Sequence, residues 1–112
     1  MPLNGYASRK LKLGTEVEHS VRVDRLPKCT RLVLQTANRD YLIETCGGLD
    51  ILLQGHPDYC SEPVAVYVAG SRRRGSEPQP GFIRSGMRVD FWDPTRGIIT
   101  TSPVRRIRIL LT

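Results

Sequence analysis

Aromatic residues are scarce, cysteines are few and long apolar runs are missing from this sequence of 112 residues. Aromatic side chains make up 6% of the chain, which leaves few rings for a large stacking surface. No stretch approaches the roughly 18 consecutive apolar residues of a membrane-spanning helix, so we predict no membrane association. Residues 1–14 contain no apolar segment typical of a secretory signal, and we therefore expect a cytoplasmic protein.

The usual sequence signatures of enzymes and nucleotide sites are also missing. The Gly47-Gly48 pair is not followed by the lysine and helix of a phosphate-binding loop. The acidic residues include no pair whose spacing requires a catalytic dyad, and no serine lies beside a convincing His/Asp partner. We predict no catalytic residue and no cofactor, and hence a non-enzymatic binding or interaction domain.

The three cysteines are an odd count in a chain without an export signal. Reduced thiols that act as small buried apolar groups are therefore expected, rather than a disulfide framework. Cys29, Cys46 and Cys60, together with His56, have the number and type of ligands of a tetrahedral zinc site. Their spacing matches no zinc knuckle, so these four residues are only a weak metal candidate and we predict no bound metal.

The positive charge is concentrated in three short clusters. The formal net charge is +6, and arginine supplies most of the cations. The clusters are Arg9, Lys10 and Lys12; Arg72, Arg73 and Arg74; and Arg105, Arg106 and Arg108. The rest of the chain is slightly acidic. An arginine excess fits phosphate or carboxylate recognition, but a GC-rich genome produces the same bias.

Alternation of apolar and polar residues predicts an all-β fold. We expect strands over residues 16–23, 30–36, 41–46, 49–54, 64–68, 87–92 and 98–101. Gly47-Gly48 and Asp93–Gly97 predict two hairpin turns. The pattern indicates a single antiparallel barrel or two-sheet sandwich of about seven strands over residues 15–112, preceded by a flexible lead-in over residues 1–14.

Two features of the strand pattern are ambiguous. Residues 104–111 carry β-branched side chains that favour a strand, but Ser102-Pro103 could also begin a short helix. His19 interrupts the apolar face of the first predicted strand, where a histidine is more often a hydrogen-bonded core residue than a ligand. We favour the strand for the last element and the core position for His19.

The loop over residues 55–63 is the most reactive part of the sequence. A turn at Pro57 would bring His56, Asp58, Tyr59 and Cys60 close together. Three functional readings are a metal site, a Cys60 nucleophile with His56 as its base, and ligand recognition without chemistry. In the favoured structural reading, Tyr59 and Cys60 close one end of the core.

The basic clusters provide a second candidate site. Small β-barrels bind single-stranded nucleic acid with a positive groove and aromatic side chains on which bases stack. The candidate contacts for an anionic partner are Arg72, Arg73, Arg74, Arg106, Arg108 and Trp92. An acidic protein would use the same arginines, so the partner class stays open between nucleic acid and acidic protein.

The order of several short motifs is similar to that of a known group of proteins. The motifs are Gly55-His56-Pro57-Asp58-Tyr59-Cys60, a valine-rich strand ending at Gly70-Ser71, Ile83-x-x-Gly86-Met87 and Ile99-Thr100-Thr101-Ser102-Pro103. Over about residues 30–110 this order resembles a group of short uncharacterised bacterial all-β proteins. The resemblance implies a bacterial, cytoplasmic, stand-alone domain, and it transfers no function or catalytic residue.

Overall fold

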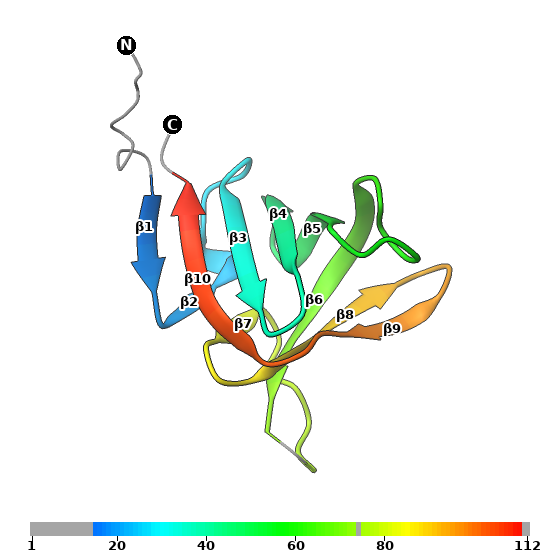
Figure 1. The fold of residues 1–112 in the computed structure, drawn as a ribbon. Helices are drawn as coiled ribbons and strands as arrows, with labels where there is room; N and C mark the ends of the chain where they lie inside the picture. The colour runs from blue at the N-terminus through cyan, green and yellow to red at the C-terminus, as the bar shows by residue number, and fades with distance from the viewer. Residues whose placement is uncertain (1–14, 74, 111–112) are drawn as a thin grey trace.

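The chain folds as an all-β protein in a computed structural model that describes residues 15–73 and 75–110. The strands are β1 (Thr15–Glu18), β2 (Ser20–Arg22), β3 (Arg31–Thr36), β4 (Asp40–Gly47), β5 (Asp50–Gln54), β6 (Val64–Arg72), β7 (Phe82–Arg84), β8 (Arg88–Asp93), β9 (Gly97–Thr100) and β10 (Val104–Leu110) (Figure 1). A single 3-10 turn, η1, covers Val23–Arg25. This confirms the predicted all-β class. The described residues contain no helix that could cross a membrane.

The strands form two antiparallel sheets. The larger has the order β1-β10-β3-β4-β5-β6-β8-β9, and β2 and β7 form the smaller. The large sheet is strongly twisted, and Figure 1 shows β10 and β3 on one side of the molecule and β8 and β9 on the other. The arrangement is sandwich-like, and within the described ranges β9 and β10 form no ladder that would close a barrel.

Two backbone hydrogen bonds join the beginnings of β8 and β10. The amide of Gly86 donates to the carbonyl of Val104 over 2.6 Å, and the amide of Val104 donates to the carbonyl of Met87 over 2.9 Å. Residues of β10 are paired with β3 on the other side of the strand. Val104 therefore connects two distant parts of the curved sheet, and this junction lies beside the candidate site described below.

The core lies on the concave side of the large sheet because every second residue of its strands faces inward. The buried apolar side chains are Val21, Val23, Leu32, Leu34, Tyr41, Ile43, Ile51, Leu53, Cys60, Val66, Val68, Ile83, Val89, Phe91, Ile99, Val104 and Ile107. Burial of these alternating groups supplies the main driving force for folding. The small sheet contributes Val21 and Ile83 and packs its own apolar face on this core.

The first predicted strand is broken in two, which corrects the expectation for residues 16–23. β1 ends at Glu18, β2 begins at Ser20, and the two strands join different sheets. His19 lies exposed at the bend between them, so the predicted core histidine is wrong. The chain turns here because β1 pairs with β10, whereas Val21 pairs with Ile83.

The C-terminal element is a strand over its described residues, and the alternative of a short helix over residues 104–111 is wrong. β10 is hydrogen-bonded to β1 on one side and to β3 on the other, which satisfies its backbone without a helix. A bulge between Val104 and Arg106 leaves both Arg105 and Arg106 exposed before Ile107 returns to the core.

Both predicted hairpins are present. The first turn contains Gly48 and Leu49, one residue later than the Gly47-Gly48 prediction, because a register shift lies between Thr45 and Gly47. In the β8–β9 hairpin, Oδ1 of Asp93 accepts the Thr95 amide over 2.9 Å. The aspartate thus stabilises the turn in the way its position predicts.

Candidate functional site

The loop that follows β5 forms a closed set of local hydrogen bonds. The amide of Cys60 donates to the carbonyl of His56 over 2.9 Å, and the amide of His56 donates to the Cys60 sulfur over 3.3 Å. The amide of Asp58 donates to Nδ1 of His56 over 3.1 Å. Cys60 is only 1% exposed and belongs to the core. The turn does gather these groups, but the thiol and one imidazole nitrogen are already engaged inside it.

Tyr59 lies on the outside of this loop. Its side chain is 43% exposed and its ring centroid is 4.4 Å from that of His56. The guanidinium of Arg96 lies 6.0 Å from the centre of the Tyr59 ring, and its Nη1 donates to the carbonyl of Asp58 over 2.8 Å. The expectation that Tyr59 and Cys60 both close the core is therefore correct for Cys60 and wrong for Tyr59.

The four weak metal candidates do not form a common site. Cys29 and Cys46 are exposed, whereas Cys60 is buried. Within residues 15–73 and 75–110, no three His, Cys, Asp or Glu side chains are placed to hold a metal ion. A nucleophilic role for Cys60 would require a substrate to reach a sulfur that is enclosed by the core.

Arginines meet where β6 ends and β8 begins. Arg72 lies directly opposite Arg88 in the β6–β8 ladder. Like charges in this position repel each other. The carboxylate of Asp90 offsets the repulsion, since its Oδ2 lies 2.8 Å from Nε of Arg72 while its Oδ1 accepts the Thr100 hydroxyl over 2.7 Å.

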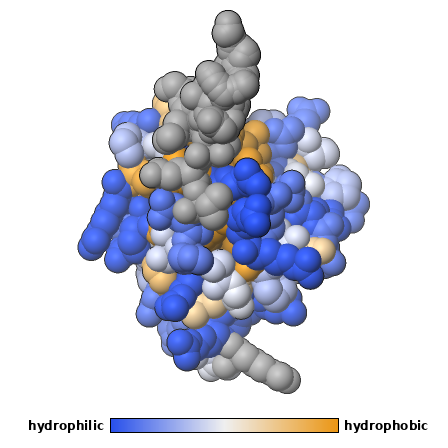
Figure 2. Space-filling view, turned by 60° about the vertical axis from the view of Figure 1, so that its left-hand side comes forward, coloured by the Kyte–Doolittle hydropathy of each residue, from blue (hydrophilic) through white to orange (hydrophobic). Residues whose placement is uncertain are grey.

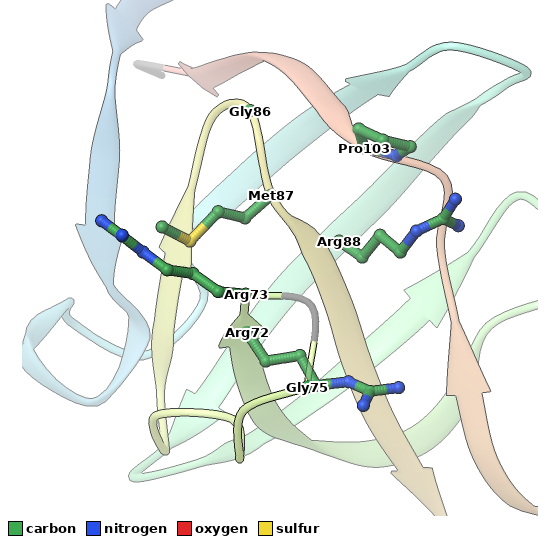
Figure 3. A pocket seen from close by; sticks show the side chains of 7 residues that line it. All are labelled: Arg72, Arg73, Gly75, Gly86, Met87, Arg88 and Pro103. Atoms are coloured by element: carbon green, nitrogen blue, oxygen red, sulfur yellow. The ribbon is translucent and has the colours of Figure 1, made fainter.

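A cavity of about 750 Å³ opens beside this arginine pair. It is lined by Arg72, Arg73, Gly75, Gly86, Met87, Arg88 and Pro103 (Figure 3). In Figure 3 the side chains of Arg73 and Met87 extend to one side of the strands, and those of Arg72 and Arg88 extend to the other. Arg88 also donates to the carbonyl of Thr101 over 3.3 Å.

Trp92 lies on the same outer face of the sheet as the arginine pair. Arg88, Asp90 and Trp92 alternate with the buried Val89 and Phe91, so the first three share the outer face of β8. Trp92 is 37% exposed.

Two strands flank Trp92 with exposed side chains. Tyr67 of β6 and Ile98 of β9 lie directly opposite Trp92, and Tyr67 is 39% exposed. The Tyr67 and Trp92 ring centroids are 6.4 Å apart, with an interplanar angle of 46°. We call the surface formed by Tyr67, Arg72, Arg88 and Trp92 the Arg–Trp face.

The remaining predicted arginines lie on another strand. Arg106 and Arg108 are on β10, which pairs with β1 and β3 and forms no ladder with β8 in the described residues. Nε of Arg108 donates to Oε1 of Gln35 over 3.1 Å, so this side chain follows β3. Figure 2 turns this side of the molecule forward and shows a mainly hydrophilic surface with small hydrophobic areas. Arg74 lies outside the described residues.

Sequence reasoning missed Arg88, the most informative residue of the face. Its alternation with Asp90 and Trp92 is visible in the sequence, but its pairing with Arg72 depends on which strands are neighbours.

Comparisons of the chain with known protein families, curated proteins and solved structures found no match. The function must therefore be argued from the chain's own residues.

Proposed function

We propose that this protein is a non-enzymatic domain that binds single-stranded nucleic acid on its Arg–Trp face. The observation that carries the proposal is that Arg88 and Trp92 lie on the same outer face of β8, with Tyr67 beside Trp92. A cationic group on the same face as exposed rings is the combination that single-strand binding requires, because phosphates need positive charge and unpaired bases need a stacking surface.

The charge of the face is available to a ligand. Asp90 is 5% exposed. Its Oδ2 contacts Arg72 and its Oδ1 accepts the Thr100 hydroxyl. It therefore compensates Arg72 and leaves Arg88 as the uncompensated cation of the face. Among the described residues, no acidic side chain lies within ion-pair distance of Arg88 or of Arg73 in the adjoining cavity.

The aromatic part of the face favours unpaired bases over an acidic protein. Trp92 and Tyr67 are exposed neighbours on the outer face of the sheet, and every base offers a ring face that can stack on them. Along β8, Arg88 is four residues from Trp92, or about 13 Å in an extended strand. A flexible strand that places a phosphate at Arg88 can place a base at Trp92.

Trp92 makes the proposal directly testable because it is the only tryptophan of the chain. We expect a single-stranded oligonucleotide to quench Trp92 fluorescence on titration, with binding that weakens linearly on a double-logarithmic plot against salt concentration. A fluorescein-labelled oligonucleotide followed by anisotropy gives the same affinity independently. A duplex of equal length and the polyanion heparin are the comparison ligands.

Matched variants separate stacking from charge. Trp92→Leu should lower oligonucleotide affinity about tenfold or more, since stacking on one ring contributes about 1–3 kcal/mol. Arg88→Gln should weaken binding and reduce the salt slope by about one phosphate contact. Arg31→Gln removes the same charge from the distant strand β3 and should change little.

The outcome that overturns the proposal is equally specific. If heparin binds as tightly as the oligonucleotide, and the oligonucleotide leaves Trp92 fluorescence unchanged, the face recognises negative charge alone and an acidic protein becomes the better partner. If neither polyanion binds at low salt, the arginines of the face serve the fold.

A further inference from the structure

We infer that Cys29 and Cys46 form an exposed dithiol that is a site of reversible oxidation to an intramolecular disulfide. Both cysteines are exposed and in no disulfide, whereas Cys60 is buried. The Cys46 thiol donates to the carbonyl of Glu44 over 3.7 Å, at the exposed surface of β4. The site lies at the beginning of β3 and the end of β4, and it uses no residue of the Arg–Trp face. The inference is independent of the proposed nucleic-acid binding.

The backbone holds the two cysteines side by side. The β3–β4 ladder ends with the pair Arg31–Glu44, and beyond it the amide of Thr45 donates to the carbonyl of Thr30 over 2.9 Å. The amide of Cys29 donates over 2.7 Å to the carbonyl of Thr45, which belongs to the same peptide group as the Cys46 nitrogen. Standard bond lengths then limit the distance between the two Cα atoms to about 7 Å. Disulfides span Cα distances of about 4.4–6.8 Å, so a small adjustment suffices.

A second contact brings the same two segments together. The carbon stem of Lys28 lies against Gly47, where an added Cβ would be 3.0 Å from Cε of the lysine. Lys28 and Gly47 are the chain neighbours of Cys29 and Cys46. The approach of the two cysteines therefore does not depend on one hydrogen bond.

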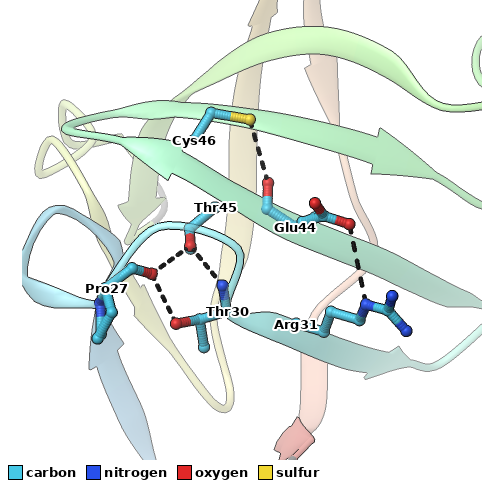
Figure 4. A network of polar contacts seen from close by, with 6 residues as sticks. All are labelled: Pro27, Thr30, Arg31, Glu44, Thr45 and Cys46. Carbon is cyan, nitrogen blue, oxygen red and sulfur yellow. Dashed lines mark hydrogen bonds and ion pairs between the residues drawn. The ribbon is translucent and has the colours of Figure 1, made fainter. Parts of the chain in front are cut away.

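A buried threonine fixes this arrangement. Oγ1 of Thr45 donates to the carbonyl of Pro27 over 2.6 Å and accepts the amide of Thr30 over 2.9 Å (Figure 4). Oγ1 of Thr30 donates to the same Pro27 carbonyl. Between these anchors Cys29 has a φ of 67°, the only positive φ of a non-glycine residue in the described ranges. The turn is thus held in a conformation that L-residues rarely adopt.

The reaction needs a low-molecular-weight disulfide such as oxidised glutathione as the oxidant. The thiolate of one cysteine attacks this disulfide, forms a mixed disulfide and releases one glutathione thiolate. The second cysteine loses its proton and attacks the protein sulfur of the mixed disulfide, which forms the Cys29–Cys46 bond and releases the second glutathione. The released thiolates take up the two protons, so two protein thiols are oxidised and one disulfide is reduced.

The test treats the reduced full-length protein with oxidised glutathione and analyses it without reducing agent. We expect a monomer whose mass is lower by two hydrogens and that dithiothreitol restores. Digestion with trypsin and an endoprotease that cuts before aspartate separates Cys46 from Cys60 at Asp50 and Asp58. The Cys29 peptide should be linked to the Cys46 peptide, and Cys60 should remain a free thiol.

Single variants make the result decisive. Cys29→Ser and Cys46→Ser should both stop at the mixed disulfide and gain the mass of one glutathione less two hydrogens, while circular dichroism confirms that each variant is folded. The inference is overturned if the wild-type protein accumulates mixed disulfides on both cysteines, forms covalent dimers or links either cysteine to Cys60.

Discussion

Nε of Arg72 on β6 lies 2.8 Å from Oδ2 of Asp90 on β8, and the carboxylate is almost completely buried. The N–H of this nitrogen is not aligned with the oxygen, so the contact is an ion pair without a well-directed hydrogen bond. Because Oδ1 of Asp90 accepts the hydroxyl of Thr100, the aspartate joins β6, β8 and β9. The ion pair therefore has a structural role at the Arg–Trp face.

Removing the arginine should leave the buried Asp90 carboxylate unpaired. Arg72→Met keeps most of the apolar stem, and we expect it to lower the free energy of unfolding by about 3 kcal/mol. Urea unfolding followed by circular dichroism measures the loss. Arg22→Met breaks the exposed Arg22–Asp24 pair and is the control, with an expected cost below about 1 kcal/mol. Equal losses in the two variants would contradict the structural role of Arg72.

Gly70 is required by a close approach of the chain to itself. Its φ is +119°, and a Cβ at this position would lie 1.7 Å from the carbonyl oxygen of Gln79. We expect Gly70→Ala to lower the free energy of unfolding by more than about 2 kcal/mol, because backbone must move. In Gly75→Ala, in the loop that follows β6, the added Cβ meets no atom within 4 Å and should cost only about 1 kcal/mol. A thermal or urea midpoint for Gly70→Ala no lower than that of Gly75→Ala would refute the close approach.

The buried Thr45 hydroxyl should contribute to stability through its two hydrogen-bond partners. In Thr45→Val the Pro27 carbonyl loses one donor and the Thr30 amide loses its side-chain acceptor. We expect the free energy of unfolding to fall by about 2 kcal/mol in urea titrations. Thr95→Val on the exposed β8–β9 hairpin should stay within about 0.5 kcal/mol of the wild type. Thr45→Val should also slow the closure of the Cys29–Cys46 disulfide, which non-reducing mass spectrometry can follow.

Tyr41 should make the protein less stable at alkaline pH. Burial raises the pKa of its phenol above the ordinary value of about 10, and the nearby Arg39 guanidinium opposes part of this rise. The folded protein therefore favours the protonated phenol, whereas the unfolded chain releases the proton at lower pH. This contribution is complete below about pH 10 and falls by up to about 1.4 kcal/mol per pH unit until the folded-state pKa is passed.

The Tyr41 prediction is checked by urea unfolding at several pH values between 8 and about 11. Tyr41→Phe should flatten the pH dependence, and Tyr67→Phe, at an exposed tyrosine, should leave it as in the wild type. An unchanged slope in Tyr41→Phe would show that the phenol is not the responsible group.

Local patterns predicted the strands and turns well. Valine alternation located β6, and Asp93–Gly97 located the β8–β9 hairpin, because both signals depend on neighbouring residues. The break at His19 was missed because it depends on Ser20–Arg22 pairing with Phe82–Arg84, more than sixty residues away. The helix alternative for residues 104–111 was wrong for the same reason, since β3 and β1 on either side of β10 decide its conformation.

The candidate site depended even more on distant pairing. The Arg72–Arg74 cluster and Trp92 were both visible in the sequence. Arg88, which joins them on one face, belongs to none of the basic clusters of the sequence. It becomes part of a site only because β6 and β8 pair in the large sheet, although β7, which lies between them in the chain, belongs to the other sheet. Arg106 and Arg108 are also arginines of a basic cluster, but they lie on β10, which pairs with β1 and β3.

The sequence by itself determined the all-β class, the inward set of most strands and the local character of the positive charge, because a period of two residues and a cluster of arginines are properties of short segments. Only the tertiary structure decided that Arg72 meets Arg88 and Asp90, that Trp92 lies beside Tyr67 and that Cys29 bonds to the Thr45 carbonyl next to Cys46. These pairs come together through hydrogen-bonded ladders between strands, whose order is chosen by burial of the whole core and not by any one segment.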